Sequence, residues 1–312
     1  MKRLKILLLV GTVALFLLVG TVALSACNGS TPGISGPWRA LERFTSVSLG
    51  GVAYGPQGFV AVGWTGFEGR IFVSPDGSTW RQVNYQVSSQ LYEITYANGL
   101  YVAVGHDNTV LLSPDGQAWQ MVYGGGVGYL NDVAFGGGRF VATGAFGYVL
   151  VSRDGTGQAW DLVDVPDGWE LRGIAYGNGV FAMTNDRGDI FVSQDGRSWE
   201  RVLQGNFRRL SKLAFTGERF VAVGREGRIL LSQDGRTWVE APANTSTGLA
   251  SVAYGEGRFV AVGWGNAALT STDGRSWTPE DLGGYYTLRD VVFGNGRFVA
   301  VGDSGAVLVR QR

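Results

Sequence analysis

The sequence predicts an all-β protein, a single seven-bladed β-propeller of four-stranded blades that occupies residues 37–312. Three observations lead to this prediction. A short box recurs with the period of a propeller blade, strand-length apolar segments recur around each box, and 50 glycines accompany only 8 prolines. Because these glycines follow no Gly-X-Y period, they indicate many tight turns rather than collagen or a linker.

The recurring box has the pattern Ser-x-Asp-Gly-x-x-Trp and appears six times, the third copy being stretched by an insertion. Successive boxes lie about 40 residues apart, a spacing typical of propeller blades with four strands each. The boxes begin at Ser74, Ser113, Ser152, Ser193, Ser232 and Ser271.

Two predicted strands precede each box, joined by a turn that usually contains Gly or Asn. Short apolar runs bounded by such turn residues predict β-hairpins and leave no room for helices. The first strands are predicted at Val52–Tyr54, Ile94–Tyr96, Val133–Phe135, Ile174–Tyr176, Leu213–Phe215, Val252–Tyr254 and Val291–Phe293. The second strands are predicted to begin at Phe59, Tyr101, Phe140, Phe181, Phe220, Phe259 and Phe298.

The seventh copy ends at its third strand, Val307–Arg310, and has no box. The segment Pro37–Leu41, before the first copy, has the features of an isolated fourth strand, with Trp38 in place of the box tryptophan. Pairing these two segments would close the ring and protect an otherwise open sheet edge. We therefore expect seven blades, the last of them built from both ends of the chain.

Residues 1–26 are predicted to be an export signal. A basic start is followed by the apolar run Ile6–Leu24, which is long enough to span a membrane, so an uncleaved transmembrane anchor is the alternative. The sequence Leu-Ser-Ala-Cys that ends at Cys27 resembles the bacterial lipoprotein signal. This resemblance implies lipidation of Cys27, export, and anchoring at the cell envelope.

Residues 27–36 are rich in Gly and Ser and are predicted to be a flexible tether. Cys27 is the only cysteine, so no disulfide forms within a monomer.

The box resembles the Asp-box (BNR) repeat of sialidases, of the vacuolar sorting receptors and of the photosystem II assembly propellers. The resemblance covers the chain after Gly36 and implies a propeller whose boxes lie away from its working face. It does not specify a function, because one fold supports many chemistries.

The six box aspartates are expected to stabilise turns rather than to catalyse a reaction. An Asp in a tight turn accepts hydrogen bonds from nearby backbone N–H groups, and the following Gly permits positive φ. The box Trp covers apolar surface beside the neighbouring blade. These structural aspartates are Asp76, Asp115, Asp154, Asp195, Asp234 and Asp273.

Positions that differ between the copies are the candidates for function. They concentrate in the turn after the second strand and in the connections between blades, both on the face opposite the boxes. Aromatic residues with arginine are typical of an interaction surface, although ordinary loop variation is the alternative. The candidate ligand- or partner-binding residues are Trp64, Arg187, Arg208, Arg209, Arg225, Arg228, Trp264 and Tyr285. Residues expected to line the channel entrance are Glu93, Asp132, Arg172, Lys212 and Asp290.

The five arginines of this set lie in blades four and five. They are expected either to clamp a carboxylate, a sulfate or an acidic partner surface, or to form solvated surface ion pairs with neighbouring acidic residues.

Composition and motifs argue against several classes of function. The charge is balanced, with 26 basic and 26 acidic residues, which argues against a general nucleic-acid binder. A single histidine, His106, has no partner ligands for a metal. No phosphate-binding loop, nucleophile elbow or metal motif is present, and no cofactor is expected. The early Arg-Ile-Pro-like segment typical of sialidases is also missing.

We therefore expect an exported, monomeric lipoprotein that is not an enzyme and that binds a protein partner or assists assembly of a complex. The alternative is a glycan-binding or glycan-hydrolysing propeller, with Trp64, Trp264 and Tyr285 as platforms on which sugars stack.

Overall fold

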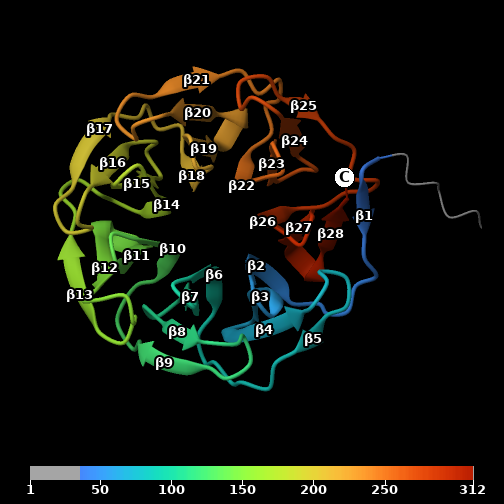
Figure 1. The fold of residues 1–312 in the computed structure, drawn as a ribbon, viewed down its shortest axis with the longest axis horizontal. Helices are drawn as coiled ribbons and strands as arrows, with labels where there is room; N and C mark the ends of the chain where they lie inside the picture. Colours follow the sequence, from blue (N-terminus) through green and yellow to red (C-terminus); the bar gives the residue numbers. More distant parts are fainter. Residues whose placement is uncertain (1–35, 312) are drawn as a thin grey trace, which may run out of the picture. The chain divides into compact units, whose positions relative to one another are not determined.

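Seven antiparallel sheets of four strands surround a common axis in the computed structural model, which describes residues 36–311 (Figure 1). This arrangement confirms the predicted seven-bladed propeller. The predicted export signal and Cys27 lie outside the described residues. Within residues 36–311, no helix has the length and apolar character needed to cross a membrane.

Each blade places its first strand next to the axis and its fourth strand on the outer wall. The first strands are β2 (Ser48–Gly55), β6 (Leu91–Ala97), β10 (Leu130–Gly136), β14 (Leu171–Gly177), β18 (Leu210–Phe215), β22 (Leu249–Gly255) and β26 (Leu288–Gly294). The second strands are β3 (Gly58–Thr65), β7 (Leu100–Gly105), β11 (Arg139–Gly144), β15 (Val180–Asn185), β19 (Phe220–Gly224), β23 (Arg258–Gly263) and β27 (Arg297–Gly302). Every first and second strand predicted from the repeats falls within these elements.

The outer half of each blade is shorter. The third strands are β4 (Glu68–Ser74), β8 (Val110–Ser113), β12 (Tyr148–Ser152), β16 (Ile190–Ser193), β20 (Ile229–Ser232), β24 (Ala268–Ser271) and β28 (Val307–Arg310). The fourth strands are β5 (Arg81–Gln82), β9 (Gln120–Tyr123), β13 (Trp160–Asp164), β17 (Glu200–Leu203), β21 (Val239–Ala241), β25 (Thr278–Pro279) and, for blade 7, β1 (Trp38–Ala40). Three single turns of 3-10 helix, which the repeats did not predict, follow second strands: η1 (Ala145–Gly147), η2 (Arg225–Gly227) and η3 (Asp303–Gly305).

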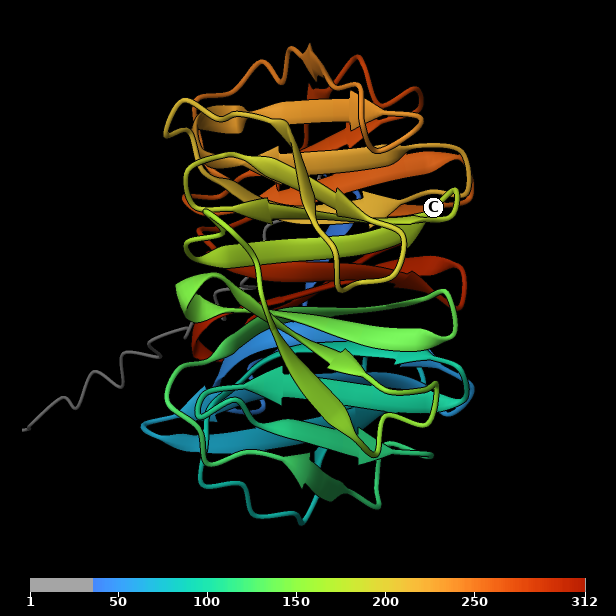
Figure 2. The same ribbon diagram turned by 90° about the vertical axis from the view of Figure 1, so that its left-hand side faces the viewer.

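The strands run between the two faces of the ring, as the edge-on view in Figure 2 shows. Because neighbouring strands are antiparallel, the box turns between third and fourth strands lie on the same face as the first hairpins. The turns between second and third strands, and the connections between blades, lie on the other face. We call these two faces the box face and the loop face.

The apolar core is divided among the junctions between blades. Each of seven clusters combines residues of two neighbouring blades; one of them packs Phe59 and Phe72 of blade 1 against Val299 and Val309 of blade 7. The second strands are therefore apolar on both sides, and β23 has only one residue that is not buried. A blade has no core of its own, so its stability depends on its neighbours.

The ring closes where the repeats predict. Strand β1 pairs antiparallel with β28, with Trp38 opposite Arg310 and Ala40 opposite Leu308. Trp38 is 1% exposed and its indole N–H donates to Glu280, 2.8 Å away, whereas the box tryptophans donate to a carbonyl of their own box. Closure therefore joins residues far apart in the sequence through a buried side chain.

Candidate functional site

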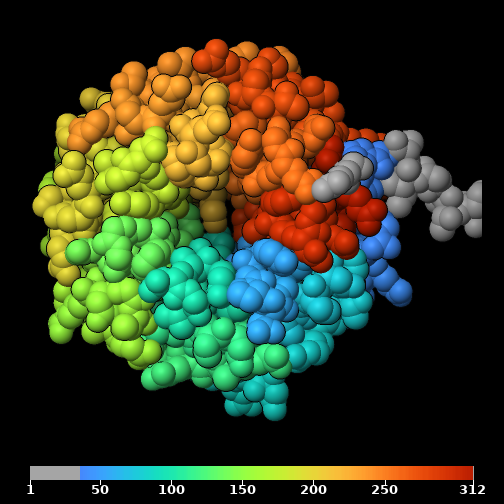
Figure 3. Space-filling view, in the orientation of Figure 1, coloured from blue at the N-terminus to red at the C-terminus, as the bar shows by residue number. Residues whose placement is uncertain are grey.

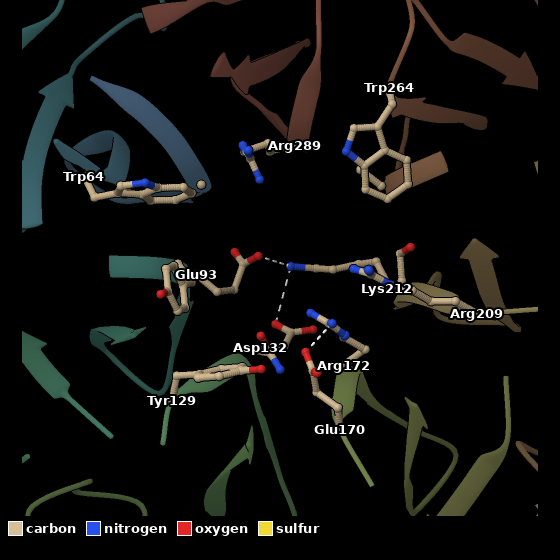
Figure 4. Close-up of a pocket in the computed structure, with 15 residues that line it drawn as sticks. Trp64, Glu93, Tyr129, Asp132, Glu170, Arg172, Arg209, Lys212, Trp264 and Arg289 are labelled. Atoms are coloured by element: carbon tan, nitrogen blue, oxygen red, sulfur yellow. Dashed lines mark hydrogen bonds and ion pairs between the residues drawn. The ribbon is translucent and has the colours of Figure 1, made fainter. Parts of the chain in front are cut away.

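A cavity of about 480 Å³ opens at the ring axis on the loop face, and residues from all seven blades line it. The hollow at the centre of the ring is visible in Figure 3, and the side chains around the cavity are drawn in Figure 4. We call this cavity the mouth. Its lining residues are Gly50, Trp64, Tyr92, Glu93, Tyr129, Asn131, Asp132, Glu170, Arg172, Arg209, Ser211, Lys212, Ala250, Trp264 and Arg289.

A break in the strand register positions the charged residues at the floor of the mouth. In each first strand the pairing shifts just after its leading leucine, for example between Leu288 and Asp290. A shift of this kind leaves backbone N–H groups without ladder partners. Carboxylates satisfy some of them: Asp132 accepts from Val133 and from Ile174 of the next blade, at 2.8 and 2.9 Å.

Lys212 joins three buried carboxylates at this floor. Its Nζ pairs with Glu93 and lies 3.4 Å from Asp132 and 3.8 Å from Asp290, as the dashed lines in Figure 4 show in part. The three carboxylates are 7%, 4% and 3% exposed. They hold the ammonium strongly and raise the pKa of Lys212 in spite of its burial. Burial and the charge of Asp290 raise the pKa of Glu93 well above its ordinary value.

Arginines line the rim at blades 4, 5 and 7. Arg172 pairs with Glu170, and Arg289 Nε donates to Asp303 at 2.5 Å. Arg209 is different, because its side chain makes no hydrogen bond or ion pair within residues 36–311 and its buried Nε has no acceptor. Burial and two neighbouring arginines, Arg172 and Arg225, lower the pKa of Arg209 to about 10.

Aromatic rings line the rim at blades 1, 2, 3 and 6. The Trp64 ring meets Tyr92 edge-on at 5.3 Å between centroids, and Tyr92 meets Tyr129 at 6.1 Å. Trp264 lies across the mouth, where the Arg209 guanidinium is 5.9 Å from its ring centre. The mouth thus presents apolar rings on one side and an unpaired cation on the other.

The structure brings some of the predicted residues together and separates others. Trp64, Arg209 and Trp264 line the mouth, as do four of the five residues expected at the channel entrance. The remaining five candidates do not line it: Arg187, Arg208, Arg225, Arg228 and Tyr285.

Packing explains where these five residues lie. Arg228 is 7% exposed, donates to the Arg208 carbonyl at 3.0 Å and lies 3.7 Å from Glu240, so its role is structural. Arg208 pairs with Glu240 and Glu226 at 3.1 and 3.2 Å. Arg187 stacks 3.3 Å above Trp169, away from the mouth. Arg225 and Tyr285 are exposed. Arg208 and Arg228 therefore share Glu240, while the other three arginines lie elsewhere, and the five do not form one clamp.

Sequence reasoning missed Glu170 and Arg289. The signal for Arg289 was present, because it occupies the repeat position of Arg172, directly before the residue at the strand bulge. Glu170 ends a connection of variable length, so the alignment of the copies does not single it out.

The boxes lie on the face opposite the mouth and are saturated with local hydrogen bonds. Asp234 Oδ1 accepts from the backbone N–H groups of Arg236 and Thr237 at 2.8 and 2.7 Å. The hydrogen bond from Thr237 is the largest influence that lowers the pKa of Asp234 to about 2. Gly235 has φ of 74°, which a residue with a side chain rarely adopts. These carboxylates are occupied by their own turns.

Within residues 36–311, no group of three or more histidine, cysteine, aspartate or glutamate side chains is arranged to hold a metal ion.

The fold and the mouth define this chain as a seven-bladed β-propeller with a central site on its loop face. Solved structures with a similar fold include YCF48 from Cyanidioschyzon merolae, with a TM-score of 0.69 and 17% identity over 88% of this chain and 98% of that one. A structure described as YCF48 bound to D1 peptide has a TM-score of 0.71 and 17% identity over 88% and 97% of the two chains. The WD40 β-propeller domain of Doa1 has a TM-score of 0.68 and 14% identity over 87% and 94%.

At these identities the likeness concerns the fold alone. No family model matches the sequence, and no curated protein matches it.

Proposed function

We propose that the chain is an exported, lipid-anchored propeller that binds a segment of a partner protein at the mouth. The observation that carries this proposal is Arg209, a half-buried guanidinium without an anionic partner within residues 36–311. A cation in this position, beside two others, gains most from an anion that a ligand brings.

The rest of the mouth fits a peptide that combines an acidic and an aromatic or aliphatic side chain. The acidic group would lie against Arg209, and the apolar group against Tyr92 and Tyr129, whose rings are already in contact. Buried aromatic and arginine residues carry most of the binding energy in protein interfaces. A structure of similar fold is described as bound to a peptide, which supports this class of ligand.

Glycan binding is the second candidate, because Trp64 and Trp264 line the same cavity. Arginine side chains already occupy positions over both rings: Arg289 lies 5.1 Å from the Trp64 centre and Arg209 lies 5.9 Å from that of Trp264. A sugar would have to displace these contacts before it stacked, so the geometry favours a peptide.

Replacing Arg209 with glutamine should weaken binding of an acidic peptide by about 1–3 kcal/mol, the range for a hydrogen bond to a charged group. The probe is a labelled, end-capped peptide of alternating glutamate and phenylalanine, and the measurement is fluorescence anisotropy. The matched control is Asp76→Asn, which alters an equivalent box turn on the opposite face and should lower stability without changing affinity.

Two outcomes of this titration contradict the proposed site. In the first, Arg209→Gln binds the acidic peptide as tightly as the wild type. In the second, a matched peptide with lysine in place of glutamate binds as well as the acidic one. Binding of neutral glycans on an array, lost in Trp264→Ala, would support the second candidate instead.

Replacing Cys27 with serine should release the protein from the membrane fraction, because acylation of this residue is the proposed anchor. Fractionation of cells followed by immunoblotting measures the change. A variant that remains with the membranes and keeps its first residues would indicate an uncleaved transmembrane segment.

A further inference from the structure

A second interaction site is suggested by pairs of side chains that connect neighbouring blades near the box face. In each pair, the residue after the box tryptophan of one blade reaches the residue after the box glycine of the next. Asp161 meets Arg197 between blades 3 and 4, and Glu200 meets Arg236 between blades 4 and 5, both at 2.7 Å. We call such a pair a junction pair.

Junction pairs also connect the first blades of the ring. Arg81 donates to Gln117 at 2.7 Å between blades 1 and 2, and Arg39 of β1 donates to Ser78 at 3.3 Å between blades 7 and 1. The same two repeat positions therefore connect blades at four junctions, with differing side chains.

Between blades 5 and 6 this pair is missing, and no side-chain pair forms at these positions between blades 2 and 3 or between blades 6 and 7 within residues 36–311. Between blades 5 and 6 the two positions hold Val239 and Arg275, which have no hydrogen bond to offer each other. Val239 is 65% exposed, and the Arg275 side chain makes no hydrogen bond or ion pair within residues 36–311. An apolar side chain thus faces solvent where blades 3 and 4 present a carboxylate.

The junction between blades 5 and 6 also has the largest groove of the three junctions compared. A groove of about 630 Å³ lies there, and both Val239 and Arg275 line it. The corresponding clefts hold about 240 Å³ beside Arg81 and Gln117, and about 370 Å³ beside Glu200 and Arg236. The missing pair therefore coincides with a groove large enough for several side chains of a peptide.

The lining of this groove defines the chemistry of its occupant. The groove's exposed apolar side chain is Val239, on the outermost strand of blade 5, while Leu231 and Ala241 line the groove from the core and are 9% and 6% exposed. Arg219 lies beside Arg275 and donates to the Asp273 carbonyl at 3.1 Å. The two carboxylates that line the groove are already engaged, Asp234 by its own turn and Glu240 by Arg208 and Arg228. The groove thus offers an apolar wall and one unpaired cation.

We infer that this groove binds an extended segment of a protein partner, with a carboxylate on Arg275 and an apolar side chain on Val239 and Leu231. The carboxylate would take the place that Asp161 and Glu200 occupy at the paired junctions. An exposed edge strand such as β21 also accepts an added strand through its free main-chain groups. This site lies apart from the mouth and does not depend on the function proposed there.

The repeats themselves supply the test, because Val239→Glu restores the missing junction pair. The internal carboxylate should then occupy Arg275 and weaken binding of an acidic segment by about tenfold or more, without lowering the melting temperature. The probe is an end-capped peptide in which valine, aspartate and valine alternate with serine, so that the three side chains share one face of an extended strand. Its binding to the full chain is followed by NMR at the Leu231 methyl groups, which every variant keeps.

Matched reagents make the outcome specific. A peptide with lysine in place of aspartate should bind much more weakly, and Arg275→Gln should remove this preference. The mouth variant Arg209→Gln should bind the probe as the wild type does. The proposal is overturned if the wild type shows no saturable shift at millimolar peptide, if the lysine peptide binds equally well, or if Val239→Glu leaves the affinity unchanged.

Discussion

Replacing Lys212 with methionine is expected to destabilise the propeller by about 3–5 kcal/mol, the cost of removing one partner from a buried ion pair. Lys212 is the only cation in contact with Glu93, Asp132 and Asp290 among the described residues, and its side chain is 18% exposed. Without it, three carboxylates would face one another in a confined space. Chemical denaturation monitored by tryptophan fluorescence measures the loss in free energy of unfolding.

Two control variants separate this effect from a general loss of charge. Arg236→Met breaks an ion pair of similar length with Glu200 on the outer wall, where both side chains are well exposed, and should cost less than about 1 kcal/mol. Adding Glu93→Gln to Lys212→Met removes one of the stranded charges and should recover part of the lost stability. If Lys212→Met and Arg236→Met lower the free energy of unfolding equally, the buried charges at the floor of the mouth do not stabilise the propeller more than a surface ion pair does.

The raised pKa values of Glu93 and Lys212 determine how the stability of the propeller depends on pH. The pKa of Glu93 is raised above its ordinary value of 4.5, so the folded state holds this proton more tightly than the unfolded state does. The resulting stability is present at acidic pH and is lost as pH rises from about 4.5 through the raised value. In Glu93→Gln the free energy of unfolding should fall less steeply over this pH range. The raised pKa of Lys212 gives stability that is retained to alkaline pH and lost only above its ordinary range.

Replacing Trp38 with alanine is expected to cost about 3–5 kcal/mol, as for other large-to-small changes in a packed core. Trp38 is 1% exposed and packs in the cluster between blades 6 and 7, beside Leu282 and Leu308. It also holds β1 on β28, so its loss weakens the pairing that closes the ring. Because an unpaired β28 would present an open edge, the variant should also self-associate more readily.

Guanidinium denaturation and light scattering measure the two effects of Trp38→Ala. The matched control is Trp238→Ala, which removes a half-buried box tryptophan within blade 5 and leaves ring closure intact. Trp38→Phe keeps most of the apolar volume and should lose less than Trp38→Ala. A Trp38→Ala variant that is no less stable than Trp238→Ala would argue that closure does not limit the stability of the ring.

The architecture could be predicted from the sequence because the same pattern of strands and turns occurs in seven copies. All seven copies have the same two apolar runs and similar turn residues, and six of them have the same box, so each boundary can be checked against the other copies. The pairing of Trp38 with Arg310 is predictable for the same reason, since the N-terminal segment supplies the strand that the last copy lacks. Local turn chemistry likewise predicts the box, in which Asp234 accepts hydrogen bonds from residues two and three positions away.

The mouth was predictable only as a region. The repeats indicate which positions vary and on which face they lie, and of the candidates chosen in this way Trp64, Arg209 and Trp264 line one cavity. The repeats could not show which arginines form ion pairs, because the residues around each arginine come from other parts of the chain. Arg228 pairs with Glu240 on the outer strand of its own blade, whereas no carboxylate within residues 36–311 forms an ion pair with Arg209.

The sequence alone determined the number of blades, the closure of the ring and the face that varies, since all three follow from local patterns repeated about every 40 residues. Only the tertiary structure decided which charges are paired. Lys212 meets Glu93 across the axis although two blades lie between them along the chain. Arg275 has no side-chain partner within residues 36–311, because Val239 lies where a polar residue stands at other junctions. Pairing depends on distances across and between blades, and these distances exist only once the ring has closed.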